Sequence, residues 1–173
     1  MRHTISAVVR NNSGVLSHVA GLFSSRGFNI DSLAVGETEN PDFSRMTIVA
    51  RGDDAVLEQI RKQLGKLIDV IKVLDFSGVD YVERELGLIK VHAPAGRKPE
   101  IILLGEAFEA IVVDITRNEL TFETTGPEAK ILAFIDTLRP YGIKEVVRTG
   151  RIAMARGPLM EGAPRESNGP GRI

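Results

Sequence analysis

The chain has 173 residues, of which 43% are hydrophobic and 26% are charged, as is typical of a globular protein with a packed core. Its net charge is −1 and neither half is basic, which argues against nucleic-acid binding because phosphate contacts need a concentrated positive surface. Cysteine is absent, which excludes disulfides, zinc–thiolate sites and a cysteine nucleophile.

The first half of the chain alternates strand and helix patterns. Apolar and polar side chains alternate in the segments that we interpret as strands, whereas apolar residues recur at helical spacing in two longer segments. The tripeptide Asn40-Pro41-Asp42 is typical of a turn and predicts a hairpin. The predicted order is a strand at 4–10, a helix at 15–26, strands at 30–38 and 43–51, a helix at 53–67 and a strand at 68–76.

The same order of elements recurs in the second half. Pro99 suits the first turn of a helix, because its missing N–H would have no partner there. The chain is therefore predicted to be an α+β protein of two ferredoxin-like βαββαβ domains with a boundary near residues 77–80. The predicted elements are a strand at 81–92, a helix at 99–108, strands at 110–116 and 120–125, a helix at 127–138 and a strand at 143–149.

The last residues are polar. Residues 158–173 are rich in Gly, Pro, Arg and Glu, and we expect a flexible tail. Just before them, Arg148, Arg151 and Arg156 lie close together in the sequence. We interpret these arginines as the solvated end of the last strand rather than as a binding patch.

The turn between the first strand and the first helix is the candidate site. We expect Ser13 to cap the helix, and Gly14 either to take a positive φ or to let a ligand approach the backbone. Free N–H groups at a helix start favour an anion such as a carboxylate. An amino acid also needs an acceptor for its ammonium group and an apolar pocket, which Asn29 and Ile30 would provide where a second copy meets the turn. A turn of this composition also suits any strand-to-helix junction, so these residues alone leave both interpretations open.

Several segments resemble one known family. Residues 11–16, 21–33 and 44–48 closely resemble the ACT domain of the regulatory, or small, subunit of acetohydroxyacid synthase, also called acetolactate synthase. Residues 82–91 and 148–157 resemble the C-terminal domain of that family. The resemblance implies an ACT effector-binding domain at 1–77, a C-terminal ferredoxin-like domain at 78–157 and a flexible tail at 158–173.

The resemblance also implies a function. Small subunits of this family are not catalytic themselves; they activate a thiamine-diphosphate-dependent catalytic large subunit and confer feedback inhibition by valine or another branched-chain amino acid. The effector sites lie between paired ACT domains, so a homodimer is expected. Gly36 departs mildly from the family, in which Ala is also usual at this position. The implied effector-binding residues are Asn11, Asn12, Ser13, Gly14, Val15, Leu16, Asn29 and Ile30.

Other functions find less support in the sequence. No catalytic or metal-binding residues and no cofactor are predicted, because His3, His18 and His92 lack ligand spacing and no phosphate loop or nucleophile motif is present. No run of about eighteen apolar residues predicts a membrane span, so we expect a cytoplasmic protein. The alternatives are an ACT-type sensor for a different partner, an enzyme with an ACT appendage, a ligand-free scaffold and an RNA-binding βαββαβ module.

Overall fold

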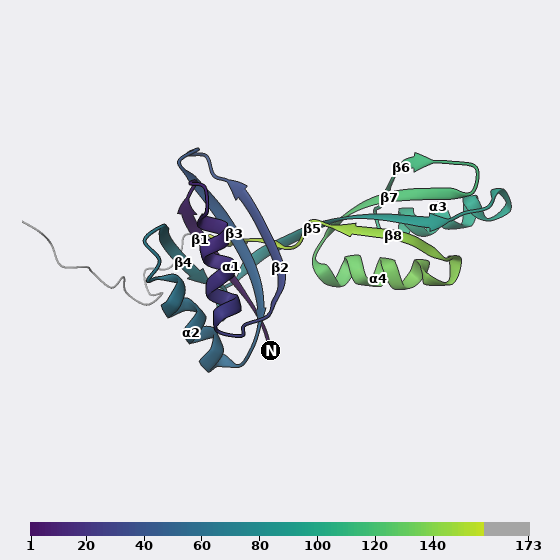
Figure 1. The fold of residues 1–173 in the computed structure, drawn as a ribbon. Helices are drawn as coiled ribbons and strands as arrows, with labels where there is room; N and C mark the ends of the chain where they lie inside the picture. Colours follow the sequence, from purple (N-terminus) through teal and green to yellow (C-terminus); the bar gives the residue numbers. More distant parts are fainter. Residues whose placement is uncertain (158–173) are drawn as a thin grey trace, which may run out of the picture.

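The computed structural model describes residues 1–157; the predicted flexible tail at 158–173 lies outside the described residues. The first unit is an antiparallel sheet in the order β2-β3-β1-β4. Figure 1 shows this unit and the second one beside it, with β5 running from one to the other. The elements of the first unit are β1 (Arg2–Arg10), α1 (Val15–Ser25), β2 (Ile30–Glu37), β3 (Phe43–Arg51), α2 (Asp54–Leu64) and β4 (Val70–Asp75).

The helix ends of this unit follow local sequence signals, with one exception. Asp53 caps α2, because its carboxylate accepts the main-chain N–H of Val56 at 2.9 Å. Gly27 follows the end of α1 with a φ of 69°, as a glycine stop requires. The predicted cap by Ser13 is wrong: Gly14 occupies the N-cap in the left-handed region, with a φ of 88°, and no side chain caps α1. The helix α2 ends at Leu64, three residues before the predicted end.

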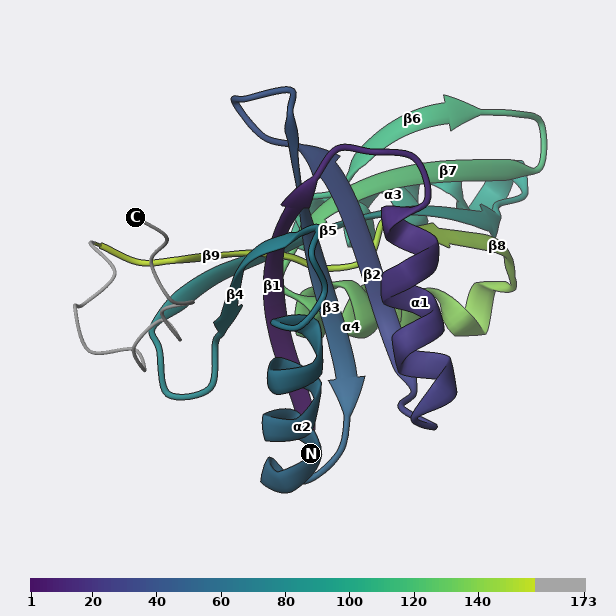
Figure 2. The same cartoon turned by 60° about the vertical axis from the view of Figure 1, so that its left-hand side comes forward.

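One face of the first sheet carries the core of the first unit. Figure 2 shows α1 and α2 on the same side of the sheet. The inward residues alternate along β1 and β3, since side chains of a strand point to its two faces in turn. Leu16 follows the buried Val15 in α1 but is itself 46% exposed. The largest buried side chains on this face are Ile5, Phe23, Met46, Ile48, Ile60 and Leu64.

The second unit repeats the order of the first, which confirms the predicted α+β class with two ferredoxin-like βαββαβ units. Its sheet has the order β6-β7-β5-β8. Pro99 lies in the first turn of α3, as predicted. The elements are β5 (Tyr81–His92), the 3₁₀ turn η1 (Ala95–Arg97), α3 (Lys98–Ala107), β6 (Ile111–Ile115), β7 (Glu119–Gly126), α4 (Glu128–Leu138), the 3₁₀ turn η2 (Arg139–Tyr141), β8 (Ile143–Arg148) and β9 (Ile152–Ala155).

Close helix-to-sheet packing forms the second core. A Cβ on Gly105 of α3 would lie 2.3 Å from Cε1 of Phe122 on β7, so only glycine lets the helix approach this ring. Phe122 meets Phe134 of α4 edge-on, with ring centroids 5.4 Å apart. The other large buried side chains are Ile89, Ile101, Leu120 and Ile131.

A short strand that the sequence did not predict connects the two units. The first four residues of β5 pair with β9, whereas the rest of β5 pairs with β7 and β8. Phe76 and Tyr81, on either side of the boundary, have ring centroids 4.8 Å apart. Thr4 and Ser6 point away from the helices of the first unit, yet both are buried. The Arg151 guanidinium, in the segment between β8 and β9, donates to the Thr4 hydroxyl at 3.2 Å.

Candidate functional site

The turn from β1 into α1 presents main-chain donors to solvent. Within the described residues, no hydrogen-bond partner is present for the main-chain N–H groups of Asn12, Ser13 and Gly14, and all three residues are exposed. They precede the N-terminus of an eleven-residue helix, where the peptide dipoles favour negative charge. A Cβ on Gly14 would meet nothing within 4 Å. Glycine is therefore needed here for its positive φ, and the space in front of the backbone is open.

Asn11 holds the turn against the far end of β2. Its amide Nδ2 donates to Glu37 Oε1 at 3.1 Å and to the Pro41 carbonyl at 3.0 Å. Its main-chain N–H donates to the Asp42 carbonyl at 2.7 Å, which joins the turn to the β2–β3 hairpin. The Glu37 carboxylate therefore contacts the side chain of the residue that directly precedes the free N–H groups. Val15 is buried under the turn, whereas Leu16 contributes an exposed apolar side chain.

Asn29 lies at the other end of β2 in the same chain. Ile30 pairs with Ala50, which pairs with His3 near the start of β1. The turn follows Arg10, at the end of β1. Seven residues of strand at about 3.3 Å each separate the two ends by roughly 23 Å. Within one chain, Asn29 and Ile30 therefore do not meet the other predicted site residues.

The Asn29 side chain contacts a charged residue that the sequence analysis did not single out. Its Nδ2 donates to Asp31 Oδ1 at 2.7 Å, and among residues 1–157 no donor contacts the amide oxygen. The other carboxylate oxygen, Asp31 Oδ2, accepts from Arg51 Nε at 2.7 Å and lies 3.0 Å from Arg2 Nε. The hydrogen bond from Arg51 lowers the pKa of the Asp31 carboxyl below its ordinary value, against the opposing effect of desolvation.

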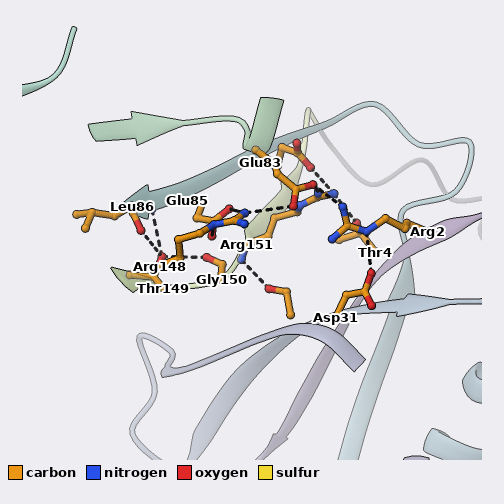
Figure 3. A network of polar contacts seen from close by, with 12 residues as sticks. Arg2, Thr4, Asp31, Glu83, Glu85, Leu86, Arg148, Thr149, Gly150 and Arg151 are labelled. Carbon is orange, nitrogen blue, oxygen red and sulfur yellow. Dashed lines mark hydrogen bonds and ion pairs between the residues drawn. The ribbon is translucent and has the colours of Figure 1, made fainter. Parts of the chain in front are cut away.

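Arg2 connects this cluster to the second unit. Its Nη1 donates to Glu128 Oε2, at the start of α4, over 2.8 Å. Arg151 Nη2 donates to the same oxygen at 2.5 Å, and Arg148 Nη2 donates to Glu128 Oε1 at 3.2 Å. Figure 3 shows Arg2, Arg148 and Arg151 converging between the two units. The interpretation of Arg148 and Arg151 as a solvated strand end is therefore wrong, because the tertiary structure places acidic partners around both.

The arginines of this junction favour the charged form of the Glu128 carboxylate. Partial burial alone would raise the pKa of Glu128, but the hydrogen bond from Arg148 and the charges of Arg2 and Arg151 outweigh it and lower that pKa. Glu85 is buried and accepts both Arg148 Nε at 2.7 Å and Arg148 Nη2 at 2.6 Å, a bidentate pair. That hydrogen-bonded pair raises the pKa of the Arg148 guanidinium. Arg148 is thus held between Glu85 and Glu128.

Two known families of sequence match the two units. Residues 5–72 match the family described as the AHAS small subunit-like ACT domain, where AHAS is acetohydroxyacid synthase, and residues 84–157 match the small subunit of acetolactate synthase. The chain belongs to the acetolactate synthase small-subunit family. It is therefore a regulatory subunit of the ACT type, as the resemblance in its sequence indicated.

Individual relatives agree with this assignment. The probable acetolactate synthase small subunit of Archaeoglobus fulgidus is 56% identical over 157 residues, which cover 91% of this chain and 98% of the relative. The small subunit of Aquifex aeolicus is 49% identical over 156 residues, which cover 90% of this chain and 81% of that one. The crystal structure of the small subunit from Thermotoga maritima superposes with a TM-score of 0.83 at 42% identity, covering 92% of this chain and 99% of that chain.

Other kinds of site have little to support them in the described part of this small subunit. Among residues 1–157, no group of three or more His, Asp or Glu side chains is arranged to hold a metal ion. None of the described helices has the length and apolar character needed to cross a membrane. Asp31, Arg2 and Glu128 were not predicted as site residues. The one signal for them in the sequence is that Asp31 lies two positions after Asn29.

Proposed function

We propose that this chain is the non-catalytic regulatory subunit of a cytoplasmic acetolactate synthase, which it activates and to which it confers feedback inhibition by valine or another branched-chain amino acid. The effector is proposed to bind between the ACT domains of a homodimer, at residues Asn11, Asn12, Ser13, Gly14, Val15, Leu16, Asn29 and Ile30. The observation that carries the proposal is the free strand edge of β2, which has an open half-site at each end.

A twofold axis through that edge would assemble the separated half-sites. β2 is the outermost strand of its sheet, and Val35 on it is 47% exposed. Two β2 edges that pair antiparallel bring the start of one strand beside the end of the other. Asn29 of one copy would then lie beside the Asn11 turn of its partner. The dimer would carry two identical sites, and neither site would be complete in a single chain.

The chemistry of the two halves suits an amino acid with an apolar side chain. The N–H groups of Asn12, Ser13 and Gly14 suit a carboxylate at the helix N-terminus. The free amide oxygen of Asn29 and the nearby Glu37 carboxylate suit an ammonium group. Leu16 and Ile30 offer apolar contact to a branched side chain.

Regulation then follows from differential binding. An effector shifts the activity of a partner only if it binds one arrangement of the dimer more tightly than another. A site that is shared by two chains meets this condition, because its affinity depends directly on how the two ACT domains sit together. The catalytic chemistry and its thiamine diphosphate belong to the catalytic large subunit in this proposal.

Reconstitution with the catalytic large subunit tests this function. We expect the full chain to raise turnover of the purified catalytic subunit and to make it sensitive to valine, leucine or isoleucine. Calorimetry on the full chain should show binding of at least one of these amino acids, and Asn29→His should abolish it without unfolding the protein. Unchanged turnover and unchanged amino-acid sensitivity would reject the proposal. Binding without any effect on turnover would instead favour an ACT-type sensor for a different partner.

An RNA-binding role is disfavoured by the sheet faces. RNA-recognition domains stack bases on aromatic side chains of their central strands. On the helix-free face of the second unit, the central strands carry Leu88, Lys90, Thr121 and Glu123, none of which is aromatic. On the same face of the first unit, Thr4, Ser6, Thr47 and Val49 of the central strands are buried and none of them is aromatic, and Phe43 at the start of β3 is the single aromatic residue there among those described.

A further inference from the structure

Strand β2 has direct polar contacts with the second unit, immediately after the residues of the proposed effector half-site. Asp31 contacts Arg2, which contacts Glu128 at the start of α4. Ser32, the next residue, accepts the main-chain N–H of Arg151 through its hydroxyl at 3.0 Å. The proposed effector residue Asn29 is thus one hydrogen bond away from the first of these contacts.

We propose that β2 transmits effector binding to the second unit through two parallel contacts. The first runs from Asp31 through Arg2 to Glu128 and is called the relay, and the second joins Ser32 to Arg151. This inference rests on the proposed function, because it concerns the effector site defined there. Arg2 and Glu128 act as positioning residues in it, and neither touches the effector.

The low exposure of these side chains makes the contacts sensitive to position. The side chain of Asp31 is 8% exposed, that of Glu128 15% and that of Arg151 13%. A partly buried carboxylate that loses its partner keeps most of its desolvation penalty. A small displacement of β2 therefore favours an exchange of ion-pair partners over a lengthened ion pair. The junction carries four acids and four arginines, and exchange of partners leaves its net charge unchanged: Asp31, Glu83, Glu85, Glu128, Arg2, Arg51, Arg148 and Arg151.

Space and partners for such an exchange are present. A cleft of about 330 Å³ separates β2 from the β8–β9 segment and is lined by residues of both contacts. Arg151 Nη1 forms an ion pair with Glu83 Oε2 at 2.9 Å, outside hydrogen-bond geometry, so Arg151 already has a second acid beside it that could take a larger share of its contacts. Gly150 lets the segment approach β2, because a Cβ there would lie 2.7 Å from the Ser32 hydroxyl.

The far end of the relay reaches the framework of the second unit. Glu128 lies in the first turn of α4, where its negative charge stabilises the helix start. Arg148, which also holds Glu128, is locked to Glu85 in the middle of β5. A change of partner at Glu128 therefore alters the charge at the start of α4 and the end of β8 together.

A matched pair of arginines separates transmission from simple stabilisation. Arg2 and Arg51 face each other across β1 and β3, and both contact Asp31. Within residues 1–157, Arg2 also contacts the second unit, whereas the ion pair of Arg51 stays within the first. Arg2→Met therefore cuts the relay, and Arg51→Met is its control. Glu128→Gln cuts the same relay from the other side, far from the effector half-site.

Hydrogen exchange and reconstitution with L-valine, L-leucine and L-isoleucine test the relay. In the unmodified chain and in Arg51→Met, we expect amino acid to change exchange at residues 127–131 and 148–152. In Arg2→Met and in Glu128→Gln, binding by calorimetry should stay within about threefold of the unmodified chain, while the exchange response at residues 127–131 disappears and maximal inhibition of the catalytic subunit falls about twofold or more. The response at residues 148–152 that Ser32–Arg151 carries should remain. The variant that combines Arg2→Met with Glu128→Gln should lose no more of the exchange response and of the inhibition than either single variant, because both substitutions remove the same contact.

Failure of the relay and failure of the proposed function give different results. If Arg2→Met binds the amino acid and still passes the full response to residues 127–131 and to the catalytic subunit, the relay is wrong. If Arg51→Met loses the response to the same extent as Arg2→Met, the effect belongs to Asp31 and the effector site, and the relay is again wrong. If the unmodified chain binds none of the three amino acids, the proposed function fails first, and that result appears without any variant.

Discussion

Gly14 is the residue at which the effect of an added charge on effector binding can be separated most cleanly from the effect of a changed backbone conformation. Its φ of 88° places it in the left-handed region, and a Cβ there would meet nothing within 4 Å. Any other residue therefore costs only the conformational term, about 1–2 kcal/mol. For a chain of this length that corresponds to a fall in Tm of about 2–8 °C, so the protein stays folded. Asn and Asp have the same shape and nearly the same conformational cost, but only Asp adds a charge.

The comparison of Gly14→Asp with Gly14→Asn therefore isolates the electrostatics of the proposed site. A carboxylate about 5 Å from a bound carboxylate, at an effective dielectric constant of about 20, costs about 3 kcal/mol, which is roughly a hundredfold in affinity. Screening reduces the difference to about tenfold at physiological salt. Calorimetric titration with valine, leucine and isoleucine at low and physiological salt measures it. Equal affinities of the two variants at low salt would refute the view that the turn binds the effector carboxylate.

Three further predictions follow from other parts of the structure. Val35→Lys on the β2 edge should convert the proposed dimer to monomer in sedimentation velocity and abolish effector binding, because a lysine there opposes edge pairing; a persistent dimer would place the interface elsewhere. Gly105→Ala should destabilise the second unit by about 1–3 kcal/mol in urea unfolding, since its Cβ would clash with Phe122; unchanged stability would show that the core can yield. The pKa values of Asp31 and Glu128 lie below their ordinary values of 3.8 and 4.5, so their contribution to stability is present above those values and is lost as pH falls through the lower folded pKa values. Urea midpoints measured from pH 7 to pH 3 should therefore fall at the acid end, and less steeply in Glu128→Gln; identical slopes would contradict this.

Much of the fold was predictable because its signals are local. Alternating apolar residues in β1 and the proline in the first turn of α3 are signals that act within a few positions of the chain, and both predictions are confirmed. Ser13 failed as a cap because Gly14 takes the left-handed conformation at the helix start, which the residue types alone left open. Leu16 is exposed although it is apolar, because the buried face of α1 is narrower than the apolar pattern of its sequence. The effector-binding residues remain a prediction, since their function depends on a second chain.

The sequence by itself determined the order of the elements within the two βαββαβ units, though not β9, and it determined the family, because each rests on periodicity, turn chemistry or a run of matched residues. The tertiary structure alone decided which charged side chains lie together. Arg2, Asp31, Glu128 and Arg151 are separated by up to 149 positions, yet they meet at one junction because β9 pairs with the start of β5 and brings the β8–β9 segment against β2. Ion pairing has no sequence period, so no pattern along the chain marks it. The same holds for the distance between Asn11 and Asn29, which the register of β1, β2 and β3 sets and which makes a second copy necessary for the proposed site.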